Sequence, residues 1–393
     1  MTDKTHPENR NFEFVDTPAA LETCCRELAG SEFIALDTEF LRERTYRPIL
    51  GLIQLATPDY TACIDPLAFD SLEPLKPVLL DPSITKVVHA GEQDLEIFHN
   101  DWGEIPSPVF DTQIAATLMG SGENIGYAAL VSKLLGVELD KSHSRTDWLR
   151  RPLAGKQLSY AADDVIYLAR LYPIMRSKLA ELGRLDWLTD DFANLTSSSR
   201  YVVEAGDAWR KVKGIGKLKG LSLAIACELA GWRESEALDK NTTRKRILAD
   251  DALLELARLQ PDKKTDLSRF RQLQHSSIQK QLATILEVID RGRSLPRDQW
   301  PVLERKRPLN ANQEALMDAL MAIVRLRADA EHIATGTLAS RKELELLVRG
   351  ETGLELLKGW RNRLVGSALQ EYLEGRMTLV IKNGKLTTRA ADH

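Results

Sequence analysis

The sequence predicts an α/β domain, built as a mixed sheet covered by helices, followed by two all-α modules. Short apolar runs alternate with helical patterns over the first 200 residues, and strand patterns nearly disappear after them. The charge changes at the same place: residues 1–200 hold 19 Lys and Arg against 31 Asp and Glu, whereas residues 201–393 hold 34 against 26. The first half is therefore suited to carboxylate chemistry and the second to an anionic ligand.

The first half shows four buried strands separated by helical patterns. The strands are expected at Glu32–Asp37, Gly51–Thr57, Tyr60–Asp65 and Lys86–Ala90. A Pro-Asp turn joins the second strand to the third, which indicates an antiparallel hairpin. The helices are expected at Pro18–Leu28, Leu72–Leu80, Asp94–Asn100, Thr112–Met119 and Gln157–Leu182. Pro77 weakens the second of these helices, and Pro173 should kink or split the last.

The second half reads as helices separated by Gly, Pro and charged residues. The predicted helices are Val202–Val212, Leu221–Trp232, Asp251–Leu259, Ser276–Arg291, Asn312–Ala330, Arg341–Val348 and Arg361–Leu373. Leu248-Ala249 and Leu338-Ala339 align at an offset of 90, which indicates two related modules, although coincidence between Leu-rich helices gives the same pattern. We expect domains at residues 1–200, 201–293 and 309–380, a Pro-rich basic linker at 294–308 and a tail at 381–393.

Composition limits the classes of protein that fit. No run of apolar residues approaches the length of a membrane span, and the polar N-terminus lacks the apolar core of a signal peptide. The four cysteines have neither zinc-site spacing nor the density of a disulfide framework. We therefore expect a cytoplasmic protein in a reducing compartment, with no membrane partner.

The informative feature is a set of carboxylates at strand ends and on one helix. Asp37 and Glu39 follow a buried run and, with the two-residue period of a strand, project from the same side. Asp94 follows another buried strand, Lys86–Ala90, at a strand-to-helix junction. Tyr160 and Asp164 are spaced i,i+4 on a core-facing helix. Buried carboxylates that repel each other need a cation, and oxygen ligands favour Mg²⁺ or Mn²⁺.

Each part alone is more typical of a cap or a loop, and only the order and spacing together are specific. Asp163 lies about 100° around the helix from Asp164, so we expect it to be solvated and dispensable. Asp111 is expected to be the N-cap of the helix that begins at Thr112.

This arrangement resembles the tyrosine branch of the DEDD exonuclease superfamily. The motif Asp37-Thr-Glu39, then Asp94, then Tyr160-x-x-x-Asp164 matches its three exonuclease motifs. The surrounding words Leu52-Ile-Gln-Leu55, His89-Ala-Gly-Glu-Gln-Asp94 and Asp111-Thr-Gln-Ile-Ala115 are similar to those of bacterial ribonuclease D. The resemblance covers almost the whole chain. It implies an RNase H-like fold followed by paired HRDC (helicase and RNase D C-terminal) modules.

The resemblance also implies a mechanism and a substrate. It makes the chain a 3′→5′ exoribonuclease that uses two divalent cations, Mg²⁺ or Mn²⁺, to hydrolyse phosphodiesters and release nucleoside 5′-monophosphates. Asp37 would bridge both ions, Glu39 and Asp164 would hold the ion that carries the water, and Asp94 would help to anchor the second ion. Tyr160 would orient the water and the phosphate. The substrates would be tRNA precursors and other small structured RNAs, and the protein would be a monomer.

A carboxylate-rich site repels phosphates, so other residues must hold the RNA. The candidates near the carboxylates are Arg44, Lys141, Arg145 and Trp148, the last as a stacking platform for a base. In the second half, Lys213 and Lys217 flank Gly214-x-Gly216, whose glycines permit a tight inter-helix turn. Local packing or solvation explains each of these residues about as well. Deleting residues 201–393 should weaken RNA binding but leave metal-dependent cleavage of short oligomers.

Two other functions remain open from the sequence. A DNA 3′→5′ exonuclease would use the same chemistry, and a non-catalytic nucleic-acid-binding protein with a decayed site would keep the same fold. The presence of all five motif residues argues against decay.

Overall fold

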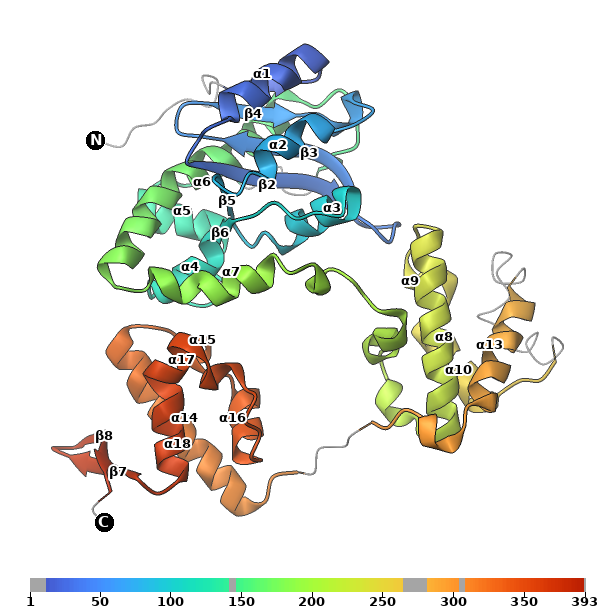
Figure 1. Cartoon of the computed structure of the whole chain (residues 1–393), viewed down its shortest axis with the longest axis vertical. Coiled ribbons are helices and arrows are strands. Elements are labelled where there is room, and N and C mark those ends of the chain that lie inside the picture. The colour runs from blue at the N-terminus through green and yellow to red at the C-terminus, as the bar shows by residue number, and fades with distance from the viewer. Residues whose placement is uncertain (1–11, 141–145, 264–280, 304–307, 392–393) are drawn as a thin grey trace.

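The computed structural model describes residues 12–140, 146–263, 281–303 and 308–391 (Figure 1). Its N-terminal α/β domain is built on a six-stranded sheet with the order β1-β4-β3-β2-β5-β6. The strands are β1 (Glu13–Val15), β2 (Phe33–Leu41), β3 (Ile49–Ala56), β4 (Thr61–Ile64), β5 (Thr85–Val88) and β6 (Val109–Asp111). Strand β3 runs antiparallel to β2 and β4, and the other pairs are parallel. The predicted mixed sheet and its hairpin are confirmed.

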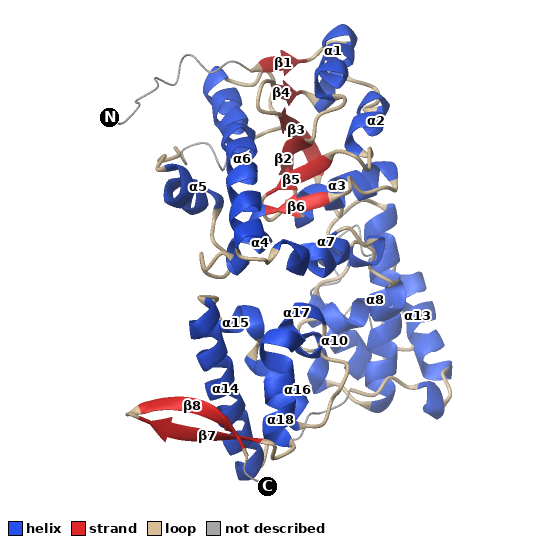
Figure 2. Ribbon diagram, turned by 60° about the vertical axis from the view of Figure 1, so that its left-hand side comes forward, coloured by secondary structure: helices blue, strands red, loops and turns tan. Residues whose placement is uncertain are grey.

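Helices cover both faces of this sheet (Figure 2). Ala35 of β2 faces a core shared with α4 (Thr112–Leu118), α5 (Tyr127–Leu135) and α6 (Gly155–Glu181). Ile34 and Leu36 face the opposite core, which includes residues of α1 (Pro18–Leu28), α2 (Lys76–Leu79) and α3 (Glu92–Trp102). This alternation follows from the two-residue period of a strand and explains why β2 is apolar on both sides.

Prolines and short strands account for the differences from the predicted elements of this domain. The expected helix Leu72–Leu80 is a 3₁₀ turn, Glu73–Leu75, followed by the four-residue α2. Pro173 does not split α6, because the residues beside it, Tyr172 and Met175, are buried and hold the helix to the core. Strands β1 and β6 were not predicted, since three residues are too few to show a period.

Two helical modules follow the α/β domain, and their helices begin at matching positions. The first contains α8 (Gly220–Asp239), α9 (Arg244–Ile247), α10 (Asp250–Leu259) and α13 (Leu282–Ser294). The second contains α14 (Ala311–Glu331), α15 (Thr335–Leu338), α16 (Arg341–Val348), α17 (Gly359–Arg361), a π-helical turn (Asn362–Gly366) and α18 (Ser367–Leu373). Helices α14, α15 and α16 each begin 91 residues after α8, α9 and α10, one more than the offset of the sequence match.

Shorter turns connect these elements, and part of one predicted helix is replaced by them. The expected helix Val202–Val212 is the 3₁₀ segment Ala205–Lys211, followed by a 3₁₀ turn at Ile215–Lys217. The predicted helix Ser276–Arg291 lies partly outside the described residues. The remaining short elements are α7 (Thr189–Leu195) and 3₁₀ turns at Pro66–Ala68, Leu185–Leu188, Ser198–Arg200, Arg297–Gln299 and Glu355–Leu357. No described helix is both long and apolar enough to cross a bilayer.

A hairpin in the C-terminal region was not predicted. It is made of β7 (Met377–Lys382), which begins inside the predicted second module 309–380, and β8 (Lys385–Ala390), which lies in the predicted tail 381–393. The two strands meet at Asn383-Gly384, where both residues have positive φ, 51° and 74°. Asn-Gly between two strands is a strong signal for a two-residue turn, so the sequence itself indicates this hairpin.

The second helical module shares a hydrophobic core with the α/β domain. Trp187 and Trp360 stack with ring centroids 5.2 Å apart. Arg184 is buried, and its guanidinium group makes two hydrogen bonds. One N–H donates to the carbonyl of Leu118, with a nitrogen-to-oxygen distance of 2.8 Å, and another donates to the Glu331 carboxylate at 2.9 Å. The two parts are therefore packed together as a continuous interior.

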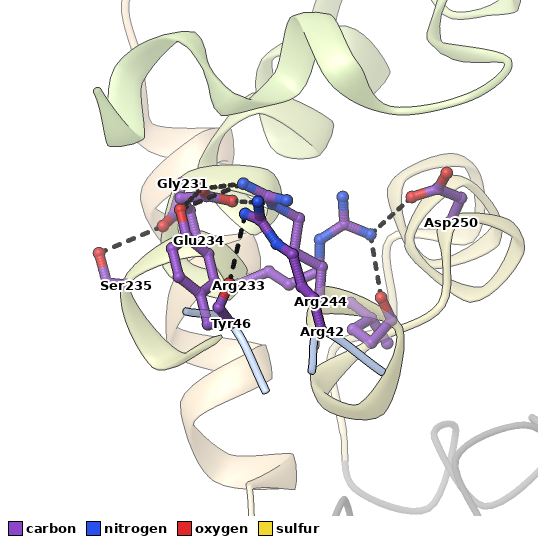
Figure 3. A network of polar contacts seen from close by, with 9 residues as sticks. Arg42, Tyr46, Gly231, Arg233, Glu234, Ser235, Arg244 and Asp250 are labelled. Atoms are coloured by element: carbon purple, nitrogen blue, oxygen red, sulfur yellow. Dashed lines mark hydrogen bonds and ion pairs between the residues drawn. The ribbon is translucent and has the colours of Figure 1, made fainter. Parts of the chain in front are cut away.

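The first helical module contacts the loop that follows β2 (Figure 3). Tyr46 of this loop donates its hydroxyl to the Glu234 carboxylate of α8 at 2.5 Å, and Arg244 donates to the same carboxylate. Asn241 accepts from the backbone N–H of Arg47 at 3.0 Å. Glu234 is only 3% exposed. Burial alone would raise its pKa, but the hydrogen bonds from Arg244 and Tyr46 hold the pKa below its ordinary value.

Removing Arg244 should strongly destabilise the protein. The substitution Arg244→Met leaves the buried Glu234 carboxylate without its cation, and breaking such a pair costs about 3–5 kcal/mol. The matched control is Lys240→Met, which removes the exposed i,i+4 partner of Glu236 and should cost about 0.3–0.5 kcal/mol. Urea unfolding followed by circular dichroism measures both; equal losses in the two variants would contradict the assignment.

Candidate active site

Four of the five predicted catalytic residues line one cleft of the α/β domain. Asp37, Glu39, Tyr160 and Asp164 surround a cavity of about 450 Å³ between β2 and α6. Asp94 is buried beside it, in the first turn of α3. Residues separated by more than 120 positions are thus brought together by the packing of one helix on one strand.

Strand β2 aims both of its carboxylates into this cleft. The strand continues through the Asp-Thr-Glu motif to Leu41, further than predicted, and its register shifts after Glu39. Asp37 pairs with Gln54 of β3, and Glu39 pairs with Leu52. Asp37 and Glu39 lie two residues apart on the face that α6 covers, as the strand period predicts.

Two positioning contacts were missed by the sequence analysis. The buried Thr38 donates its hydroxyl to the carboxylate of Asp94. Tyr127 of α5 donates its hydroxyl to the backbone carbonyls of Asp163 at 3.1 Å and Asp164 at 2.5 Å. A threonine between two motif carboxylates could have suggested the first contact, whereas nothing local to Tyr127 indicates the second.

The electrostatics of the cleft disfavour four simultaneous negative charges. Burial, and then the charges of Asp94, Asp164 and Glu39, raise the pKa of Asp37 well above its usual value. Burial and the neighbouring carboxylates raise the pKa of Glu39 to about 8. Burial raises the pKa of Asp164 to about 7 and that of Asp94 to about 6. No described Lys or Arg forms an ion pair with any of these four side chains.

The chemistry of this donor set fits divalent metal ions. Clustered carboxylates that lack a basic partner are the oxygen ligands that Mg²⁺ and Mn²⁺ prefer. Among the described residues, no three His, Cys, Asp or Glu side chains already converge tightly enough to form a finished metal site. A bound cation would reduce the repulsion between these carboxylates.

The neighbouring acidic residues have other roles. Asp111 is confirmed as the N-cap of α4, since its side chain accepts from the N–H groups of Gln113 and Ile114. It also accepts from the backbone of Ala90 and Gly91 at the turn before α3. Asp163 was predicted to be solvated, but it is half-buried, and Tyr127 of α5 donates to its backbone carbonyl.

Trp148 does not offer a stacking surface, so its proposed contact with a base is wrong for this structure. Its side chain is 3% exposed and packs with Leu52, Ala161 and Ala162. A Cβ at Gly51 would meet the Trp148 Cβ at 2.9 Å, so the tryptophan lies directly on β3. Tertiary packing against a glycine, which no local pattern shows, buries this ring.

The remaining RNA-contact candidates fall into two places. Lys141 and Arg145 lie outside the described residues. Arg44 is exposed on the loop after β2. Lys213 and Lys217 line a cleft of about 1010 Å³ in the first helical module, and Gly214 between them adopts φ 91°, as the predicted tight turn requires.

The metal-free protein should lose stability as the pH rises from about 4 to about 8. Carboxyl groups in the unfolded chain have pKa values near 4, whereas those of Asp94, Asp164 and Glu39 are about 6, about 7 and about 8 in the fold. The folded state binds more protons in that interval, so the free energy of unfolding falls as the pH rises.

Mg²⁺ requires deprotonated carboxylates, so the increase in Tm that it produces should be larger near pH 8 than near pH 6. Differential scanning calorimetry in EDTA and in saturating Mg²⁺ measures this difference. The Asp164→Asn variant should flatten the pH dependence in EDTA. An equal effect of Mg²⁺ at both pH values would contradict the assignment.

Comparisons with known proteins agree with the site. Residues 12–180 match the family described as 3′-5′ exonuclease, and residues 222–289 match the HRDC domain. Ribonuclease D of Bartonella henselae is 36% identical over 97% of this chain and 95% of its own length. Ribonuclease D of Jannaschia sp. is 38% identical over 95% of this chain and 98% of its own length.

The fold agrees as well. The crystal structure of Escherichia coli RNase D, an exoribonuclease involved in structured RNA processing, superimposes with a TM-score of 0.82. It is 34% identical and covers 93% of this chain and 99% of its own. A crystal structure of a protein from Bifidobacterium adolescentis shares the fold, with a TM-score of 0.70 at 23% identity. With a 3′→5′ exonuclease domain, an HRDC domain and full-length relatives of this kind, the chain belongs to the ribonuclease D family of 3′→5′ exoribonucleases.

Proposed function

We propose that this exoribonuclease hydrolyses phosphodiesters with two divalent cations, Mg²⁺ or Mn²⁺, and trims the 3′ trailing residues of tRNA precursors and other small structured RNAs. The observation that carries the proposal is the meeting of Asp37, Glu39, Asp164 and Tyr160 in one cleft, with Asp94 held beside it by Thr38. Nucleoside 5′-monophosphates are the products. We further propose that the protein acts in the cytoplasm as a monomer.

The carboxylates divide the work by their place in the cleft. Divalent cations supply Lewis acidity that lowers the pKa of a bound water and stabilises the leaving 3′ oxygen. Asp37, which feels the charges of Asp94, Asp164 and Glu39 together, would be the residue suited to contact both ions. Glu39 and Asp164 would hold the ion beside the nucleophilic water, and Asp94, held by Thr38, would anchor the other.

Tyr160 is assigned to orientation of the water and the phosphate. Burial and the charge of Asp164 raise the pKa of its phenol further above the ordinary value, so it does not lose a proton near neutral pH. A tyrosine here, one turn before Asp164, supports the proposal that the chain belongs to the tyrosine branch of the superfamily.

The second helical module is proposed to be a second HRDC-like domain. Helices α14, α15 and α16 repeat the order of α8, α9 and α10 at a constant offset of 91 residues. The residues that end α9 and α15, Leu248 and Ala339, share φ −157° and similar ψ, 119° and 132°. The proposed domains keep the bounds 1–200, 201–293 and 309–380, the last now extended by the β7–β8 hairpin.

The first helical module is proposed to hold the RNA backbone. Its cleft is lined by more basic than acidic side chains: Lys211, Lys213, Lys217, Arg233, Arg244, Lys245 and Arg258 against Asp250, Asp251 and Glu255. Asp250 already accepts from Arg233 at 2.7 Å and from the N–H of Lys213 at 3.0 Å, which offsets its charge. The exposed lysines are thus available to phosphates.

The chemistry is tested by matched aspartate variants on end-labelled RNA and DNA oligomers of the same sequence. In Mg²⁺ or Mn²⁺, the wild type should shorten the RNA from its 3′ end one nucleotide at a time. Asp37→Asn and Asp164→Asn should lower the rate at least about 100-fold, the scale of losing one group that stabilises transition-state charge. Asp163→Asn, one residue away, should keep most of the activity.

Other outcomes would favour the competing functions. Preferential degradation of the DNA would favour a DNA exonuclease, and binding of both without degradation would favour a non-catalytic binding protein. Activity retained in Asp164→Asn but lost in Asp163→Asn would refute the assignment of the third motif.

RNA binding should depend on salt through the lysines of the first module. Replacing both Lys213 and Lys217 by Gln removes two phosphate contacts, so the slope of log K against log salt should fall by about 1.4 for single-stranded RNA. The paired control, Lys382→Gln with Lys385→Gln on the exposed C-terminal hairpin, changes the net charge equally. Fluorescence anisotropy measures both; equal slopes in the two variants would contradict a phosphate-binding cleft.

A further inference from the structure

Gln54 is a polar residue in an apolar position. It is the single polar side chain of β3, whose sequence is ILGLIQLA, and it is 0% exposed. Neither its amide nitrogen nor its amide oxygen has a hydrogen-bond partner among the described residues. Burying an amide without a partner is unfavourable, so a leucine in this position would give a more stable fold.

The neighbours of Gln54 include the carboxylates of the cleft. Gln54 pairs with Asp37 of β2 on one side and with Cys63 of β4 on the other, so all three side chains project from the same face. Helix α6 covers this face through Leu158, Ala161 and Ala162. Asp164 is close enough that, after burial, its charge is the second cause that raises the pKa of the Cys63 thiol.

The amide is therefore buried on the sheet face that carries Asp37, next to the catalytic cleft, and has no hydrogen-bond partner among the described residues. Directly opposed residues of an antiparallel pair have Cβ atoms about 4.5–5.5 Å apart. A glutamine side chain spans that gap, so its N–H groups can reach a carboxylate on the opposed residue. Metal-bound carboxylates have a remaining oxygen that needs a donor.

We propose that Gln54 is a positioning residue of the exonuclease site, whose side-chain amide donates to the Asp37 carboxylate when cations draw the four carboxylates together. This inference rests on the proposed metal-dependent function and adds a residue outside the five motif positions. The cost of the unpaired amide in the metal-free state is offset when the site is loaded. Gln54 holds Asp37 in place and does not touch the reacting atoms.

The test separates this role from a packing role because stability and metal affinity should change in opposite directions: the Tm in EDTA should rise, and the affinity for Mn²⁺ should fall. In EDTA, Gln54→Met removes an unpaired amide and should raise the Tm. In the same variant, isothermal titration calorimetry should show Mn²⁺ affinity reduced about 10–100-fold, the usual effect of losing a partner of a metal ligand. The kcat on a short RNA should fall while KM stays near the wild-type value. Gln54→Leu should behave in the same way.

The matched control is Leu52→Met, on the same strand and the same face, which changes shape without changing polarity. It should leave Mn²⁺ affinity and kcat within about twofold of wild type, since such swaps are well tolerated. A Gln54→Met variant with a raised Tm and unchanged Mn²⁺ affinity would overturn the proposal.

A measurement on the wild type covers the case in which the variants do not fold. With ¹⁵N-labelled glutamine, the side-chain amide signal of Gln54 should shift on saturation with Mg²⁺, and an unmoved signal would overturn the proposal. Failure of the proposed function looks different: the wild type would then bind neither Mg²⁺ nor Mn²⁺, whatever stands at position 54. The control is Asp37→Asn, which should lose metal binding outright and shows what complete loss looks like in the same assay.

Discussion

The gathering of four carboxylates, with Asp94 buried and the others partly buried, is the constraint on which this structure depends. Asp37, Glu39, Asp94 and Asp164 come from three different elements. Neighbouring carboxylates make Asp37 and Glu39 harder to ionise, and burial has the same effect on Asp94 and Asp164. Apart from one another, these side chains would be ordinary acids. Held together, they are suited to bind a cation, and part of the favourable free energy of cation binding offsets the cost of bringing them together in the fold. Tyr127 donates to the backbone of α6, and Thr38 donates to Asp94 of α3. These two contacts help to keep the carboxylates together despite that cost.

The sequence is informative where chemistry follows from local periods. The two-residue period of β2 placed Asp37 and Glu39 on one face, and the helical period placed Tyr160 above Asp164. It is uninformative where burial is decided by a distant partner. From the sequence, Trp148 was expected to be an exposed aromatic beside basic residues. Gly51, almost a hundred positions earlier, has no Cβ to clash with it, and this allows the tryptophan to pack in the core. The hairpin at Asn383-Gly384 is a different case, because its signal was local and was outweighed by the helical character of the region.

The link between the catalytic strand and the first helical module is unusually direct. The loop that carries Tyr46 leaves β2 after Leu41, two residues beyond Glu39, and Glu234 and Arg244 fasten that loop to α8 and α9 (Figure 3). Arg233 and Arg244 also line the basic cleft. The first helical module, which is proposed to hold the RNA, is thus connected to β2, which carries Asp37 and Glu39, through one short loop. The ionic contact between Glu234 and Arg244 secures that loop.

This packing changes how the two halves can be separated experimentally. A protein truncated after residue 200 would expose Trp187 and Arg184, which are covered by the second module, and would leave Tyr46 without Glu234. Loss of RNA binding in such a fragment would therefore not distinguish missing phosphate contacts from a damaged catalytic domain. The lysines of the cleft are exposed and carry no such burden, so their charge can be removed without disturbing the core. The acidic half that carries the exonuclease site and the basic half proposed to hold the RNA therefore differ in charge, but their shared contacts mean that they are not two separate bodies.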